Sequence, residues 1–114
     1  MKLIVAIIRP EKLEAVQDAL DEREVHLMTV SNVHGCGSQR GYTETFRGGK
    51  IPVRLLPKVK LEIAVNEDFV QATISAIMSN ARSEPGKIGD GKIFISTIDS
   101  AIRIRNGDKG DEAL

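Results

Sequence analysis

Four segments of the chain have the hydrophobic pattern of β-strands. Residues 3–8 are apolar without interruption, which is typical of a central strand with both faces covered. Residues 25–33 are rich in β-branched side chains, and residues 59–65 place an apolar side chain at every second position. Residues 92–98 form the fourth apolar segment, directly after a glycine-rich turn. The pattern therefore predicts four strands.

Two segments between these strands have the spacing of amphipathic helices. Residues 10–22 begin with Pro10, which suits a first helical turn, and residues 67–81 follow Asn66, a favourable N-cap. The apolar positions that set the helical spacing are Leu13, Val16 and Leu20 in the first segment and Val70, Ile74 and Ile77 in the second. Both segments are predicted to be helices.

The resulting order, β-α-β-β-α-β, predicts a ferredoxin-like α+β sandwich. In this fold two helices cover one face of a four-stranded antiparallel sheet, and the second face has no helix over it. Residues 3–8 are apolar on both sides of the strand, and Phe94 points away from some core-facing neighbours. Because an exposed apolar face is a liability, we expect another subunit to cover it.

A long loop separates the second and third predicted strands. Residues 38–56 have neither helical nor strand periodicity and contain three glycines and a proline. From residue 38 to residue 60, six lysines and arginines stand against Glu44 alone. Loops of this length are uncommon in compact domains and are often functional. Two interpretations remain open, a solvated hairpin or a mobile basic arm that docks on a partner.

The segment Gly86–Phe94, with sequence GKIGDGKIF, has the composition of an anion-binding turn. Three glycines allow close approach of the backbone to a ligand, and Lys87 and Lys92 have the charge that suits phosphate. The segment matches G-x-x-x-x-G-K, but Ile93 stands where a P-loop has Ser or Thr, and a strand follows instead of a helix. A plain turn is the alternative interpretation.

Two further basic features point to the same ligand chemistry. Arg103 and Arg105 lie two residues apart, so they would share one face of an extended strand. Two guanidinium groups on one face suit a phosphate chain, because each can bind an anion bidentately. Together with Lys58 and the glycine turn, they favour binding of a polyphosphate or nucleotide over mere decoration of a surface strand.

Composition limits the classes of function. The chain has 114 residues and a formal net charge of zero, which predicts one domain and argues against a general nucleic-acid binder. Its single cysteine, Cys36, excludes an intrachain disulfide and fits a reducing compartment. No segment approaches the roughly 20 apolar residues of a membrane span. We therefore expect a cytoplasmic protein without membrane insertion.

The sequence offers little for catalysis. His26 and His34 are eight residues apart, too far for joint metal ligation on a strand, and Cys36 lies between two glycines without a neighbouring base. A non-enzymatic binding protein is the main prediction. A small nucleotide-dependent enzyme and an RNA-binding ferredoxin-like module are the alternatives, although the chain has only three Phe and one Tyr for stacking on bases.

Several motifs together resemble one family, the PII nitrogen-signalling proteins. The likeness covers residues 1–108 and is most specific in the glycine segment and the Arg-Ile-Arg segment. The motifs are Gly35-x-Gly37-x-Gln39-x-Gly41, Thr43-Glu44, Arg47-Gly48, Leu56-Pro57-Lys58-Val59-Lys60, Gly86–Phe94 and Ile102-Arg103-Ile104-Arg105.

The resemblance implies a homotrimer that binds ATP or ADP in each cleft between subunits and senses 2-oxoglutarate together with Mg-ATP. It divides the single domain 1–114 into a T-loop at about residues 37–56, a glycine turn at about 83–92 and a C-terminal segment at about 101–114. The T-loop would regulate protein targets, such as an ammonium transporter or nitrogen-assimilation enzymes. No nucleic acid is implied as a partner.

The resemblance also implies a role for particular residues of this chain. The nucleotide-binding residues would be Thr29, Gly37, Ser38, Ala64, Gly89, Asp90, Gly91, Lys92, Arg103 and Arg105. The 2-oxoglutarate site would use Gln39, Arg40, Gly41 and Lys58, with Gln39 also binding magnesium, and Arg47 would enter the transporter pore.

The chain departs from the family pattern at the positions of covalent modification. Ile51 stands where uridylylated members have a tyrosine, and Gly49 stands where phosphorylated members have a serine. Neither acceptor is present at its usual position. Ser38 replaces a commonly basic residue next to the phosphates, and the connection through Ser83-Glu84-Pro85 is longer than usual.

Overall fold

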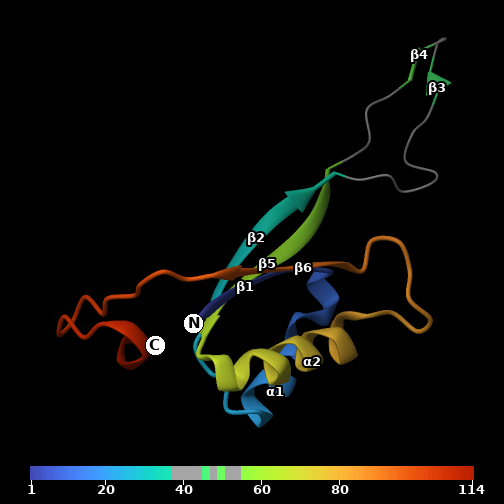
Figure 1. The fold of residues 1–114 in the computed structure, drawn as a ribbon. Helices are drawn as coiled ribbons and strands as arrows, with labels where there is room; N and C mark the ends of the chain where they lie inside the picture. Colours follow the sequence, from blue (N-terminus) through green and yellow to red (C-terminus); the bar gives the residue numbers. More distant parts are fainter. Residues whose placement is uncertain (37–44, 47–48, 51–54) are drawn as a thin grey trace.

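A four-stranded antiparallel sheet with two helices on one face forms the body of the molecule (Figure 1). The computed structural model describes residues 1–36, 45–46, 49–50 and 55–114. The strands of the sheet are β1 (Lys2–Ile8), β2 (Thr29–Gly35), β5 (Leu56–Val65) and β6 (Gly91–Thr97). They lie in the order β2-β5-β1-β6, so the two outer strands are β2 and β6. This topology confirms the predicted ferredoxin-like α+β fold.

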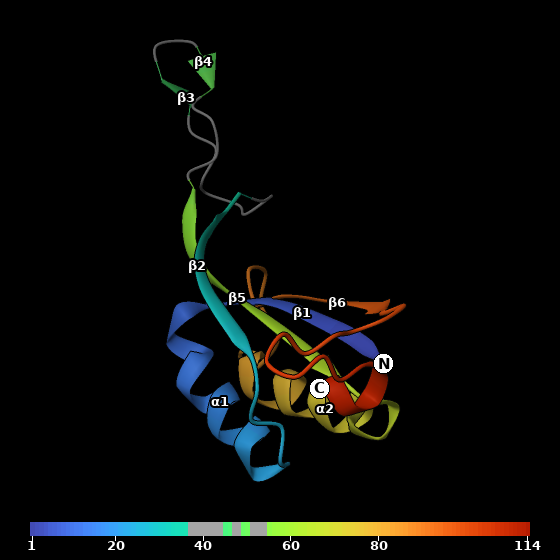
Figure 2. The same cartoon turned by 90° about the vertical axis from the view of Figure 1, so that its left-hand side faces the viewer.

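Both predicted helices are present, and each begins with a 3-10 turn. The turn η1 (Pro10–Lys12) leads into α1 (Leu13–Glu22), and η2 (Glu67–Phe69) leads into α2 (Val70–Ala81). Pro10 occupies the first helical position, where its missing N–H costs no hydrogen bond. Figure 2 shows both helices on the same side of the sheet.

The core lies between the helices and one face of β1 and β5. The register pairs Ile4 with Ile63 and Ala6 with Leu61, so buried positions of the two strands stand next to each other. All four of these side chains are fully buried. From the helices, Val16, Leu20, Ala76 and Ile77 complete this layer. The strict alternation of β5 therefore corresponds to burial of every second residue.

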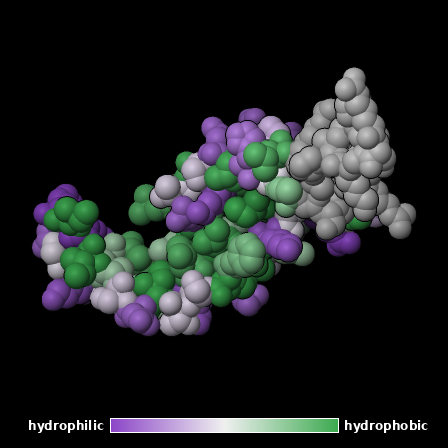
Figure 3. Space-filling view, turned by 90° about the horizontal axis from the view of Figure 1, so that it is seen from above, coloured by the Kyte–Doolittle hydropathy of each residue, from purple (hydrophilic) through white to green (hydrophobic). Residues whose placement is uncertain are grey.

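The opposite face of the sheet has no helix over it. In the register of β1 and β6, Val5 pairs with Phe94 and Ile7 pairs with Lys92, which places these side chains on the uncovered face. Phe94 is 55% exposed. Figure 3 looks onto this face and shows apolar residues gathered over its middle. The predicted uncovered apolar face is thus present in the single chain.

The second strand begins later than its composition predicts. Residues 25–28 are not part of β2, which starts at Thr29. The N–H of Val25 instead donates to the carbonyl of Leu20 at 2.9 Å, and Val25 is buried in the core directly after α1. Val25 therefore packs into the core although it lies in the connection between α1 and β2. Burial of its side chain at this point outweighs its propensity for a strand.

Two short strands occur within the predicted T-loop region. These strands, β3 (Thr45–Phe46) and β4 (Gly49–Lys50), pair with each other in an antiparallel ladder. The C-terminal segment ends in a further 3-10 turn, η3 (Gly110–Ala113), and Ile102 forms an isolated antiparallel bridge with Lys109.

Candidate functional site

The sheet register brings the glycine turn next to the beginning of the T-loop region. Gly91 pairs with Ile8 at the end of β1, and Gly35 pairs with Leu56 where β2 and β5 leave the sheet. Between these two places, the Lys58 Nζ donates a hydrogen bond to the carbonyl oxygen of Gly89 at 2.7 Å. A cation on β5 is thereby joined to the middle of the glycine turn.

A hollow of about 450 Å³ lies at this junction. Two lysines, Lys58 and Lys92, supply positive charge to its wall, while Ile7 and Phe94 supply apolar surface. Its lining residues are Ile7, Gly35, Cys36, Leu56, Lys58, Ile88, Gly89, Gly91, Lys92 and Phe94. This combination suits a ligand with an anionic group and an apolar part.

Glycine is required at position 91 by both conformation and space. Gly91 has a φ of +114°, a region that other residues rarely adopt. A Cβ atom placed there would lie 1.7 Å from the carbonyl oxygen of Ile7, far inside van der Waals contact. Gly89 also has a positive φ, +97°. The two glycines therefore let the turn pass close to β1 and reach Lys58.

Asp90 braces the turn from inside. Its carboxylate accepts hydrogen bonds from the Lys87 N–H at 2.9 Å and from the Ser83 hydroxyl and N–H at 2.6 and 3.0 Å. The Arg9 Nε donates to the same carboxylate at 3.2 Å. The hydrogen bond from Lys87, followed by that from the Ser83 hydroxyl, holds the pKa of Asp90 well below its usual range. The charged side chain therefore points back into the turn, where it serves the turn's own structure.

The sequence analysis did not identify Arg9 and Ser83 as residues that hold the glycine turn. Arg9 also donates from Nη2 to the carbonyl of Ile88 at 2.9 Å, so its guanidinium contacts both neighbours of Gly89. The available signal was the position of Arg9 directly after the first strand. In an antiparallel pairing the end of β1 lies next to the start of β6, which places Arg9 beside Asp90.

Arg103 and Arg105 do not lie on one face of a strand, so that prediction is wrong. The N–H of Gly107 donates to the carbonyl of Arg103 at 2.8 Å, which closes a turn through this segment. Gly107 has a φ of +75°, and the side chain of Asn106 accepts from the N–H of Asp108. Local turn chemistry at Asn106-Gly107 thus outweighs the alternation that predicted an extended segment.

Arg103 is engaged inside the C-terminal segment. It donates to the Asp108 carboxylate at 3.2 Å and to the Glu112 carbonyl at 2.7 Å, whereas Arg105 is exposed. This segment follows the end of β6 that lies away from the glycine turn (Figure 1). One chain therefore brings together Lys58, Gly89 and Lys92 but not the two arginines.

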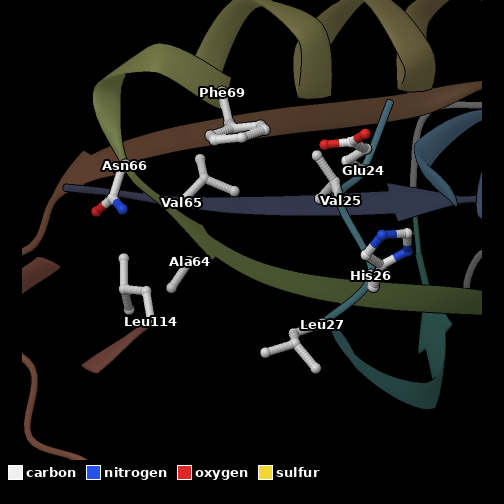
Figure 4. A pocket seen from close by; sticks show the side chains of 9 residues that line it. All are labelled: Glu24, Val25, His26, Leu27, Ala64, Val65, Asn66, Phe69 and Leu114. Atoms are coloured by element: carbon white, nitrogen blue, oxygen red, sulfur yellow. The ribbon is translucent and has the colours of Figure 1, made fainter. Parts of the chain in front are cut away.

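Thr29 and Ala64 lie apart from Lys58 as well. Thr29 is exposed at the start of β2, and Ala64 lines a separate hollow of about 230 Å³. Figure 4 shows this second hollow, which is lined by Glu24, Val25, His26, Leu27, Ala64, Val65, Asn66, Phe69 and Leu114. The buried Asn66 Oδ1 has no hydrogen-bond partner in the described part of the chain.

The remaining predicted site residues lie outside the described residues. They are Gly37, Ser38, Gln39, Arg40, Gly41 and Arg47, and Ile51 at the modification position falls there too. Within the described ranges, no group of three or more His, Cys, Asp or Glu residues could hold a metal ion. None of the helices described is long and apolar enough to cross a membrane.

Fold and site define a ferredoxin-like protein with a basic hollow where the glycine turn meets the end of β2 and the start of β5. Comparison with known proteins gives the family, because the profile described as "Nitrogen regulatory protein P-II" matches residues 1–108. The chain belongs to this family of nitrogen regulatory signalling proteins. Membership favours signalling over the enzyme and RNA-binding alternatives.

Relatives from several organisms match along the whole chain. "Nitrogen regulatory protein P-II 2" of Methanothermobacter thermautotrophicus is 51% identical over all 114 residues, which cover 97% of that protein. "Nitrogen regulatory protein GlnK1" of Methanosarcina mazei is 46% identical, again over all of this chain and 97% of the relative. "Nitrogen regulatory protein P-II" of Cereibacter sphaeroides is 48% identical over the full length of both chains.

Proposed function

We propose that this protein is a homotrimeric sensor that binds ATP or ADP between neighbouring subunits and signals through its T-loop. The observation that carries the proposal is the division of basic groups in one chain. Lys58 and Lys92 line the hollow at the glycine turn, whereas Arg103 and Arg105 follow the far end of β6. A neighbouring copy would supply the arginines that complete a phosphate site.

The uncovered apolar sheet face supports assembly of several copies of the chain. If each copy covers this face of its neighbour, the result is a cyclic oligomer. We expect light scattering at low micromolar concentration to give three times the chain mass of 12.5 kDa. Phe94→Glu should lower this mass, because it places a charge on the uncovered apolar face. Met78→Glu is the matched control, since Met78 is 51% exposed but lies on α2. A stable wild-type monomer would contradict both the trimer and the shared site.

In the proposed nucleotide site, Lys92, Arg103 and Arg105 neutralise the phosphates. We expect Arg105→Ala to weaken ATP binding by about 1.5–3 kcal/mol, the range for a hydrogen bond to a charged group. Arg103→Ala should have a similar effect. Isothermal titration calorimetry with ATP and ADP would measure both losses.

Arg103 needs a control because it also holds the C-terminal segment in place. Asp108→Asn weakens the contact with Arg103 but retains the arginine, so it should reduce affinity less than Arg103→Ala. Unchanged ATP affinity in both arginine variants would reject the proposed phosphate contacts.

The proposed response to 2-oxoglutarate links the nucleotide to the T-loop. An amide oxygen such as that of Gln39, together with phosphate oxygens, fits the hard-ligand preference of magnesium. The keto-acid would bind next to the metal and direct its far carboxylate toward Lys58, with Arg40 and Gly41 nearby. Each ligand state would favour the T-loop conformers that it contacts best. Some of these conformers would present Arg47 to a transporter, and others would hold Arg47 away from it.

A further inference from the structure

Arg9 links the two residues on either side of Gly89. Its Nε contacts the Asp90 carboxylate at 3.2 Å and its Nη2 contacts the Ile88 carbonyl at 2.9 Å. Gly89 itself accepts the hydrogen bond from Lys58 on its carbonyl. The guanidinium of Arg9 therefore holds both neighbours of Gly89, the residue whose carbonyl accepts the hydrogen bond from Lys58. A planar guanidinium presents its N–H donors in a fixed fork that reaches both acceptors at once, whereas the ammonium of a lysine is a point charge on a flexible stem.

The contacts of Asp90 extend this attachment around the turn. Ser83 donates from both its hydroxyl and its N–H, and Lys87 donates from its N–H. The carboxylate thus joins the start and the middle of the turn to the end of β1, where Arg9 lies. Because Gly89 and Gly91 lack side chains, these hydrogen bonds supply the restraint that the glycine backbone does not.

The pairing of Arg9 with Asp90 also has an electrostatic consequence. The two side chains are 24% and 16% exposed, so water screens this ion pair less than it screens a surface pair. Without Arg9, the Asp90 carboxylate would keep its hydrogen bonds from Ser83 and Lys87 but lose the cation that contacts it. The two neighbours of Asp90 in the sequence, Gly89 and Gly91, line the hollow that contains Lys58 and Lys92. A negative charge without its cation at this place would oppose the entry of a phosphate.

We propose that Arg9, Asp90 and Ser83 form a clasp that fixes the ligand-free glycine turn in its binding shape and cancels the charge of Asp90. Arg9 is then a positioning residue that acts through Asp90 and Ile88. This inference rests on the proposed nucleotide site for its consequence, whereas the clasp itself consists of hydrogen bonds within the chain.

Hydrogen–deuterium exchange of the ligand-free protein tests the clasp directly. We expect Arg9→Ala to speed exchange of the amides of residues 84 and 86–91 on the order of tenfold, since hydrogen bonds to charged groups are lost. Arg9→Lys should give an intermediate rate and Ser83→Ala a smaller increase. Lys87→Ala is the matched control, because it removes a cation from the turn but retains the N–H that the clasp uses. Equal exchange in wild type and Arg9→Ala would overturn the proposal.

Titration with ATP and with inorganic tripolyphosphate tests the consequence. Arg9→Ala should weaken both on the order of tenfold, and adding Asp90→Asn should restore part of the loss by removing the negative charge that no longer has a cation beside it. A merely structural role predicts that the double variant binds at least as weakly as Arg9→Ala, so the absence of recovery would overturn the charge argument. If wild type binds neither probe, the proposed function fails, while the exchange rates still decide whether the clasp exists.

Discussion

Gly91→Ala is expected to destabilise the protein by on the order of 3–5 kcal/mol, which combines a strained φ with displacement of packed backbone. The added Cβ would lie 1.7 Å from the carbonyl oxygen of Ile7, so β1 and the start of β6 could not keep their present spacing. Urea unfolding at fixed protein concentration would measure the change, because stability of an oligomer depends on concentration.

Gly107→Ala provides a matched control for the conformational part of this effect. Gly107 also has a positive φ, +75°, but a Cβ there would meet nothing within 4 Å. Gly107→Ala should lower the free energy of unfolding by only about 1–2 kcal/mol, which is the cost for a non-glycine residue of adopting this backbone region. Equal losses in the two variants would show that the close approach to Ile7 does not determine the need for glycine at position 91.

2-Oxoglutarate is expected to bind wild-type protein with Mg-ATP, weakly with Mg-ADP, and not with ATP plus a chelator. In the proposed mechanism Gln39 would help to hold the magnesium ion of Mg-ATP, and the keto-acid would depend on both the metal and the γ-phosphate for its binding. Lys58→Ala should abolish measurable binding, because the far carboxylate loses its cation. Calorimetric titration in each of the three nucleotide conditions would test this prediction.

Lys60→Ala is the control for loss of a lysine from the same strand and the same face. Lys60 lies two residues after Lys58 and pairs with Glu62 at 3.6 Å, so its removal should leave 2-oxoglutarate binding unchanged. Linkage also requires 2-oxoglutarate to tighten ATP by the factor by which ATP tightens 2-oxoglutarate. Equal binding in all three nucleotide conditions would contradict the metal-dependent mechanism, and no binding in any would leave a sensor of adenylates alone.

The architecture could be predicted because burial repeats along this chain with a local period. Every second residue from Val59 to Val65 is apolar, and every one of those positions is buried. The two helices were predicted by the same principle with helical spacing. Where the prediction failed, a local interaction outweighed the strand periodicity of the sequence. Val25 packs into the core from a connection, and the Asn106-Gly107 turn bends the segment that contains Arg103.

The candidate site was only partly predictable. The composition of the glycine turn and the charge of Lys58 pointed to an anion, and the structure brings these parts together through the pairing of β1 with β5 and β6. The resemblance implied that Asp90 contacts the nucleotide, which stays a prediction, whereas the structure adds that its carboxylate accepts hydrogen bonds from within the turn. A residue type alone does not say which way its side chain points.

By itself, the sequence determined the order of strands and helices, the apolar character of both sheet faces and the family to which the chain belongs. Only the tertiary structure decided that Arg9 meets Asp90, a residue 81 positions later, and that the segment with Arg103 and Arg105 follows the end of β6 that lies away from the glycine turn. The physical reason is that periodicity and turn chemistry act over a few neighbouring residues, whereas the partners of a charged side chain are set by strand register across the sheet.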